Sequence, residues 1–123
     1  MSRHFLVIGA ISGFLSVALG AFAAHALKVR LTAHLLAIFE TGVRYQLTHA
    51  LALLAVGILA RGSDSRLLQV AGWSFVGGTL VFSGSLYALS TLGERWLGAI
   101  TPVGGAAFLV GWACLAAAAW RQG

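Results

Sequence analysis

The chain has 123 residues and a net charge of +5, and its composition is strongly apolar. Only 9% of the residues are charged and 59% are hydrophobic, against roughly 25% and 45–50% in an ordinary soluble domain. A soluble monomer of this size buries only about two-thirds of the surface that its unfolded chain exposes, which is too little to hide so much apolar area. The composition therefore excludes a soluble monomer and indicates a single transmembrane domain over residues 1–123.

The basic residues stand at the ends of apolar runs and do not gather on one soluble face. Their positions indicate membrane anchors and not a nucleic-acid-binding surface. The single cysteine, Cys114, lies inside the last apolar run. One cysteine excludes an intramolecular disulfide and a cysteine-based metal cluster.

The first apolar run covers 5–27 and is longer than the roughly 7–15 residues of a signal-peptide core. We therefore expect an uncleaved membrane helix here. Small residues recur along it at spacings of four and three, which places them on one face where another helix can approach closely. They are Gly9, Gly13, Ser16 and Gly20.

The second run covers 33–60 and follows Thr32, whose hydroxyl is suited to cap the first helical turn. A helix of this length extends about 42 Å, which exceeds a hydrocarbon core of about 30 Å. We expect the crossing itself to occupy 41–60. The first two turns would then lie outside the core, with Gly42 as the place for a bend.

A polar turn at 61–66 leads to a third helix at 67–91, which is as rich in Gly, Ser and Thr as membrane helix interfaces are. After a loop at 93–98, Thr101 and Pro102 fit the N-cap and the first position of a fourth helix at 102–120. The glycines of these two helices that we expect to pack against other helices are Gly77, Gly84, Gly104 and Gly111.

Short loops between consecutive crossings predict an all-α, up-down four-helix bundle in the membrane. Polar residues near the ends of the first and third helices then share one half of the bundle with those near the starts of the second and fourth. They are His25, Glu40, Arg44, Tyr45, His49, Tyr87 and Thr101. Basic loop residues are slightly more frequent on the side of the termini, which favours cytoplasmic termini.

Glu40 and Arg44 have the spacing and order of a helical ion pair. Two interpretations are open: the pair anchors the helix at the membrane interface, or it shapes a polar cavity between helices. Tyr45 and His49 repeat the spacing, and we expect this polar side to face the bundle. His49 is then either a structural hydrogen-bonding group, or a proton relay, cofactor ligand or lipid contact.

A haem held between His25 and His49 is disfavoured because the two residues lie at different depths. The sequence contains no metal-binding motif, no phosphate-binding loop and no Ser nucleophile elbow. We therefore expect no metal, no cofactor and no enzymatic activity.

Five separated motifs together resemble one family. They are Gly20-Ala-Phe-Ala-Ala-His-Ala-Leu27, Phe39-Glu-Thr-Gly-Val-Arg-Tyr-Gln46 followed by His49-Ala-Leu-Ala-Leu-Leu54, Phe82-Ser-Gly-Ser-Leu-Tyr87, Thr101-Pro-Val-Gly-Gly105 and Gly111-Trp112. The chain is similar to the uncharacterised family of small inner-membrane proteins typified by bacterial YgdD, which has mitochondrial relatives. The resemblance implies a four-helix protein of the bacterial inner membrane and supplies no activity, substrate or cofactor.

Within that resemblance, the recurring positions match His25, Glu40, Tyr45, His49, Tyr87 and the turn at 101–105. Two departures are visible. Ala23 stands where the family usually has Gly, and the segment 31–35 lacks the acidic, proline-containing turn common at that point.

The sequence therefore predicts a small membrane protein that works by binding membrane lipid, a partner membrane protein or further copies of itself, with a polar pocket in one leaflet. The alternative is a small transporter or proton-linked channel subunit with a polar path through Glu40, Arg44, Tyr45 and His49. Residues 55–60 of the same helix carry no polar side chain until the turn begins, so the sequence offers half of such a path.

Overall fold

The computed structural model describes residues 1–122 and contains four long α-helices joined by short connections. The helices are α1 (Ser2–His25), α2 (Ala33–Leu59), α3 (Arg66–Leu92) and α4 (Thr101–Gln122), and 3-10 segments η1 (Leu27–Val29) and η2 (Arg95–Ala99) lie in the first and third connections. All four helices are long and apolar enough to cross a membrane. The predicted all-α membrane bundle is confirmed, with every predicted boundary close to the observed one.

Local side-chain chemistry accounts for several helix ends. The Thr32 hydroxyl accepts a hydrogen bond of 3.2 Å from the backbone N–H of Leu35, which confirms the predicted cap of α2. Ser65 caps α3 in the same way. Gly93 closes α3 with a left-handed φ of 74°, and its N–H donates to the Leu89 carbonyl; a glycine carries no side-chain penalty in that conformation.

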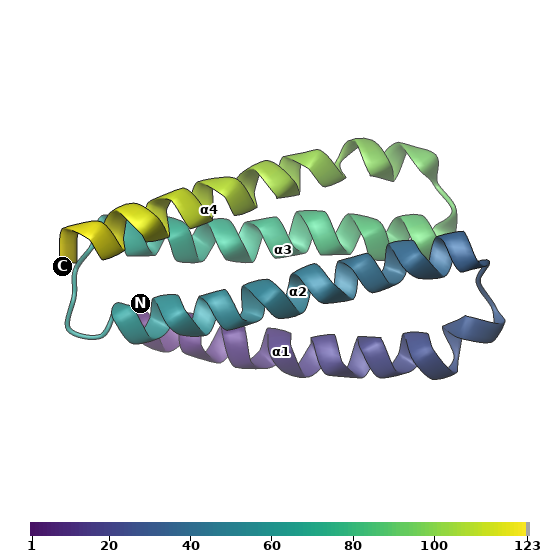
Figure 1. Cartoon of the computed structure of the whole chain (residues 1–123), viewed down its shortest axis with the longest axis horizontal. Helices are drawn as coiled ribbons and strands as arrows, with labels where there is room; N and C mark the ends of the chain where they lie inside the picture. Colours follow the sequence, from purple (N-terminus) through teal and green to yellow (C-terminus); the bar gives the residue numbers. More distant parts are fainter. Residues whose placement is uncertain (123) are drawn as a thin grey trace.

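The helices run up and down in sequence order, so that each one packs against the next along the chain (Figure 1). From one edge of the molecule to the other the order is α1, α2, α3, α4, and both termini lie at the same end. The first and last helices are therefore at opposite edges. The two middle helices carry most of the contacts that hold the molecule together.

α2 is an uninterrupted helix through Gly42, where the sequence suggested a bend. A Cβ at this position would lie 2.7 Å from Cε1 of the Tyr87 ring. The glycine therefore makes room for an aromatic ring of α3, and the helix needs no break there.

Aromatic rings packed on glycines recur where α3 meets α1, α2 and α4. Because lipid is as apolar as the side chains, close packing rather than the hydrophobic effect associates membrane helices. A Cβ on any of the recipient glycines would overlap its neighbour. The pairs are Phe5 on Gly72, Tyr87 on Gly42, Phe108 on Gly78 and Phe75 on Gly111, and the backbone of Phe82 lies against Gly104.

The glycines predicted to pack against other helices fall into three groups. Tight positions are Gly9, where a Cβ would be 3.0 Å from the Ala50 carbonyl oxygen, and Gly104 and Gly111. Looser positions with ordinary van der Waals contact are Gly13 and Gly20. Gly77 and Gly84 have nothing within 4 Å of an added Cβ, so they pack against no other helix of this chain.

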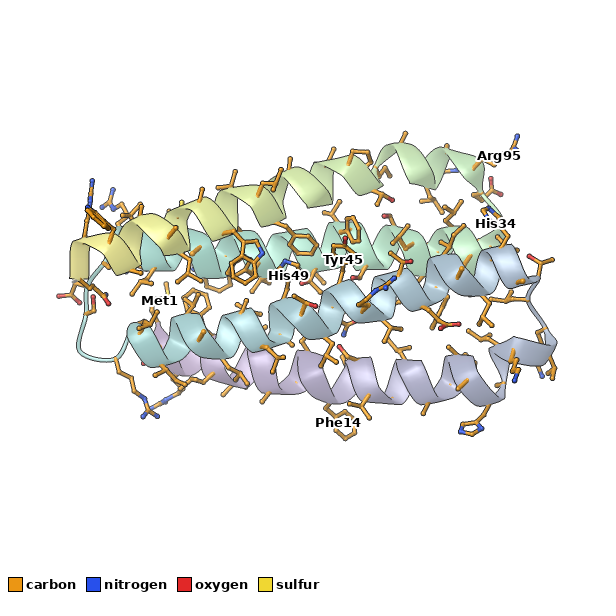
Figure 2. The ribbon with its side chains drawn as sticks, viewed as in Figure 1. Met1, Phe14, His34, Tyr45, His49 and Arg95 are labelled. Atoms are coloured by element: carbon orange, nitrogen blue, oxygen red, sulfur yellow. The ribbon has the colours of Figure 1, made fainter. Side chains whose placement is uncertain are left out.

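Two apolar clusters occupy the two halves of the molecule. The larger contains Phe5, Leu53, Leu68 and Phe75 near the termini, and the smaller is formed by Ala23, Leu27 and Phe39 at the opposite end. Large apolar side chains also point outward, such as Phe14, which projects from α1 with 74% of its surface exposed (Figure 2). Outward apolar residues of this kind are expected at a lipid-facing surface.

Gly104→Ala should destabilise the protein by about 1–3 kcal/mol, because the new methyl group overlaps the Phe82 backbone and backbone cannot turn aside. Thermal unfolding in detergent micelles measures the effect. Gly77→Ala is the matched control, since its methyl group meets nothing and alanine favours the helix by up to about 1 kcal/mol. Equal melting temperatures for both variants would contradict the packing described.

Candidate functional site: the polar layer and the groove around α2

The buried positions of α2 repeat at spacings of three and four along its whole length. They include Phe39, Gly42, Gln46, His49, Leu53 and Val56. This period keeps one stripe of the helix facing its neighbours. The two polar side chains of the stripe, Gln46 and His49, thus enter the interior between the apolar clusters.

Gln46 connects three helices. Its Nε2 donates a hydrogen bond of 3.1 Å to the carbonyl oxygen of Ser12 in α1, and its Oε1 accepts a hydrogen bond from the Tyr87 hydroxyl of α3. Only 6% of the Gln46 surface is exposed. A buried amide with both ends paired fixes the depth of all three helices relative to one another, because sliding any of them breaks a bond.

Two further hydroxyls of α3 bond to neighbouring helices. Ser83 Oγ donates to the Gly42 carbonyl oxygen of α2 at 2.7 Å. Ser85 Oγ lies 2.5 Å from Thr101 Oγ1 at the start of α4. Thr101 is the first residue of α4, and its hydroxyl thus helps to join α4 to α3.

His49 is held by both of its ring nitrogens. Nδ1 lies 2.7 Å from the Tyr45 carbonyl oxygen, and Nε2 accepts a hydrogen bond of 3.0 Å from the indole N–H of Trp112 in α4. A carbonyl only accepts and an indole N–H only donates, so the proton must be on Nδ1 and the ring must be neutral. The Phe108 ring stacks on the imidazole with centroids 3.6 Å apart.

Glu40 and Arg44 are exposed, contrary to the expectation that the polar side of α2 faces the bundle. Tyr45 does face neighbouring helices: its ring lies 4.7 Å from that of Phe82 in α3, although 41% of the residue is exposed. Within residues 1–122 Arg44 forms no ion pair with Glu40; its Nη2 lies 3.4 Å from Thr41 Oγ1. The reason is the helical period: the buried stripe is centred near Gln46, and Arg44 lies on the far side of the helix.

The seven residues predicted to share a polar pocket do not line one cavity. A hollow of about 460 Å³ is lined by Thr41, Arg44, Tyr45 and Thr48 on the outer side of α2. Tyr87 lies on the other side, bonded to Gln46. His25 is exposed at the end of α1, and His49 lies near the middle of α2 (Figure 2).

A groove between α1 and α3, with α2 as its floor, has the most apolar lining of the hollows described. Its volume is about 370 Å³. α1 contributes Ile8, Ile11, Ser12, Leu15 and Leu19; α2 contributes Gln46 and Leu53; α3 contributes Val76, Thr79, Leu80, Ser83, Gly84 and Tyr87. Gly84, which packs against no helix, therefore has a place in the wall of this groove.

The chain's chemistry gives little support for metal or haem ligation. Within residues 1–122, no group of three or more His, Cys, Asp or Glu residues is placed to hold a metal ion. Both nitrogens of His49 are engaged in hydrogen bonds, and His25 is the last residue of α1 and is exposed.

A polar transport path through the membrane is also unsupported. The interior polar groups Gln46, His49 and Tyr87 are paired with one another or with neighbouring helices. Towards the termini the larger apolar cluster closes the interior. The outward position of Arg44 removes it from any interior route.

The sequence analysis did not identify three residues whose hydrogen bonds join the helices in the interior, namely Gln46, Ser83 and Trp112. A signal for Gln46 was present, because the three-and-four spacing from Phe39 through Gly42 continues to it and on to Leu53. No comparable signal identified Trp112, since its partner His49 lies 63 residues earlier in the sequence.

Comparison with known proteins places the chain in a family. Residues 19–105 match the family model described as "Protein of unknown function (DUF423)". The chain belongs to the DUF423 family. No solved structure matches it.

Relatives of this DUF423 protein match it over most of its length. It is 44% identical to the UPF0382 membrane protein YwdK of Bacillus subtilis, over 95% of this chain and 96% of the relative. Identity to the UPF0382 inner membrane protein YgdD of Escherichia coli is 41%, over 98% and 92% of the two chains. A protein of Staphylococcus saprophyticus is 42% identical over 92% and 93%. The predicted family and the multi-pass inner-membrane localisation are thereby confirmed, and the family's function is unknown.

Gln46→Leu and Tyr87→Phe should each destabilise the protein, because each leaves the other residue's polar group buried without its partner. The double variant should lose less stability than the two losses added together. We expect a coupling free energy of about 0.6–1.7 kcal/mol, the range for hydrogen bonds between membrane helices. Unfolding in detergent micelles measures it.

The control for this cycle is Thr91→Ala combined with Gln46→Leu. The Thr91 hydroxyl donates only within its own helix, to the Tyr87 carbonyl oxygen at 2.7 Å. Its effect should add to that of Gln46→Leu without coupling. Strict additivity in the Tyr87 cycle would show that the inter-helix hydrogen bond is not formed.

Nitrogen NMR of ¹⁵N-labelled protein in nanodiscs at neutral pH should show His49 as a neutral ring protonated at Nδ1. Trp112→Phe removes the donor to Nε2 and should shift the Nε2 resonance while the proton stays on Nδ1. An Nε2-protonated or doubly protonated ring in the unchanged protein would contradict this arrangement.

Proposed function

We propose that this DUF423 protein is a non-enzymatic lipid-binding protein that holds one hydrocarbon chain in the groove between α1 and α3. The shape of the groove carries the proposal. Along α1 it extends from Ile8 to Leu19, a length of about 16 Å at 1.5 Å per residue.

The narrowness of the groove supports a hydrocarbon chain as the ligand. The space open to atom centres is about 370 Å³ and is spread over about 16 Å of helix, so its mean cross-section is about 23 Å². An α-helix with its side chains is about 10–12 Å across and is too wide for this space. A single methylene chain, whose carbons contact their neighbours at about 3.5–4.0 Å, is narrow enough to enter.

The lining supports a chain rather than a polar ligand. Most polar groups of the groove have partners within the protein: Gln46 bonds to Ser12 and Tyr87, and Ser83 bonds to Gly42. The Thr79 hydroxyl, in the α3 wall, has no partner among the described residues. The apolar side chains of α1 and α3 make up the walls. A chain held on three sides gains dispersion contacts that a chain in the fluid bilayer does not keep.

Native mass spectrometry of protein extracted in mild detergent tests the proposal. The unchanged protein should retain one lipid. Gly84→Leu places a side chain in the groove from a position where a Cβ meets nothing within 4 Å, and displacing about ten carbon contacts at about 0.1–0.2 kcal/mol each should lower retention about tenfold.

Gly77→Leu is the matched control. Gly77 lies on the same helix, also has open space around it, and does not line the groove. Its retained lipid should equal that of the unchanged protein. Absence of bound lipid in the unchanged protein, or equal retention by both variants, would overturn the proposal.

A further inference from the structure

We propose that the outer face of α2 is the interface for a second copy of this chain, and that two mutual ion pairs between Glu40 and Arg44 join the copies. This face lies away from the groove and does not depend on the proposed lipid binding. Its residues are Ala37, Thr41, Arg44, Thr48, Leu51 and Ala55, with Glu40 at its border.

The outer face has the spacing of a helix-packing seam. Its six residues follow one another at intervals of four, three, four, three and four, the period by which one helix lies along a partner. α2 thus carries two such stripes. The first, through Gln46 and His49, is buried by α1, α3 and α4, and the second has no helix of this chain against it.

Small side chains allow another helix to come close to this face. Ala37, Thr41, Thr48 and Ala55 occupy four of its six positions, and small residues at such spacing are typical of membrane helix interfaces. Both threonines already bond to their own helix: Thr41 Oγ1 donates to the Ala37 carbonyl oxygen and Thr48 Oγ1 to that of Arg44. A partner helix can therefore cover them without leaving an unpaired hydroxyl.

The depth of Arg44 favours a charged partner on this face. Arg44 lies about 16 Å along α2 from its first residue, and α2 at about 40 Å exceeds a hydrocarbon core of about 30 Å, so the base of the Arg44 side chain is inside the core. Charged groups there are costly unless paired. Arg44 and Glu40 are both exposed and form no ion pair within residues 1–122.

A two-fold axis along the membrane normal satisfies both charges. Between two copies that insert with the same orientation, such an axis sets the two α2 helices side by side and parallel, and every contact occurs twice. When the two outer faces pack with equal residue numbers at equal depth, as in a parallel coiled coil, Thr41 of one copy packs next to Glu40 of the other. The Arg44 guanidinium is already beside Thr41, with Nη2 3.4 Å from its hydroxyl, and thus meets that carboxylate.

Like-charge variants test the interface in native membranes, with two differently tagged full-length chains and co-purification as the measurement. Glu40→Arg gives two cations on each chain and Arg44→Glu gives two anions. Each variant alone should self-associate about tenfold less than the unchanged chain, because like charges then face each other. Expressed together, the two variants should associate as the unchanged chain does, since opposite charges meet again.

Cysteine crosslinking gives a second, independent measurement. In a Cys114→Ala background, Thr48→Cys lies in the seam and should form a disulfide dimer on mild oxidation. Leu80→Cys is the control, because Leu80 is 71% exposed on α3 and away from α2's outer face; it should give no dimer above the background of the Cys114→Ala chain.

Three outcomes would overturn the proposal: an unchanged chain that is monomeric in both measurements, single variants that associate normally, or a mixture of variants that fails to associate. A monomer in which Arg44→Glu alters only the retention of anionic lipid would assign the face to a lipid headgroup instead. Loss of the retained chain in Gly84→Leu with the dimer intact would separate this inference from the proposed groove.

Discussion

The hydrogen bonds of Gln46 are the interaction on which the arrangement of the other helices depends. A bilayer provides no hydrophobic force to draw apolar helices together, and specificity must come from packing and from polar groups that cannot be left unpaired. One amide bonded to the α1 backbone and to a hydroxyl of α3 sets the relative depth of three helices. The bond between His49 and Trp112 does the same for α4. Every helix is thus registered against α2.

Aromatic rings on glycines supply the close contact that these hydrogen bonds orient. Rings of α1, α3 and α4 lie over glycines of α2, α3 or α4 that could not carry a methyl group in this structure. Most of these pairs join neighbouring helices, and Phe5 on Gly72 reaches past α2 to join α1 to α3. Each ring fills the space that a missing side chain leaves, so interhelical distance and lateral position are fixed together. The polar bonds set depth, and the ring contacts set spacing.

Composition, run length and turn residues were sufficient to predict the fold. The four helices, the cap at Thr32 and the glycine contacts at Gly9, Gly104 and Gly111 follow from local signals. Which side of α2 faces the other helices could not be predicted in the same way. Conspicuous charges drew attention to Arg44, whereas the buried stripe runs through Gln46, a residue that becomes visible only when the three-and-four spacing is followed from Phe39 onward. Contacts such as His49 with Trp112 depend on tertiary packing and leave no local pattern.

The sequential order of the helices has a consequence for how the protein assembles. In a bundle whose first and last helices are in contact, the packing is complete only after the last helix has been inserted. Here α1 and α4 lie at opposite edges (Figure 1). As the chain emerges during synthesis, α2 finds α1 already inserted, α3 then finds α2, and α4 finds α3. Some contacts of aromatic side chains skip a helix, such as Phe5 of α1 with Gly72 of α3. These contacts also involve only an earlier helix that is already in the membrane. Each added helix can thus be docked on arrival, without a final closing step between the two ends of the chain.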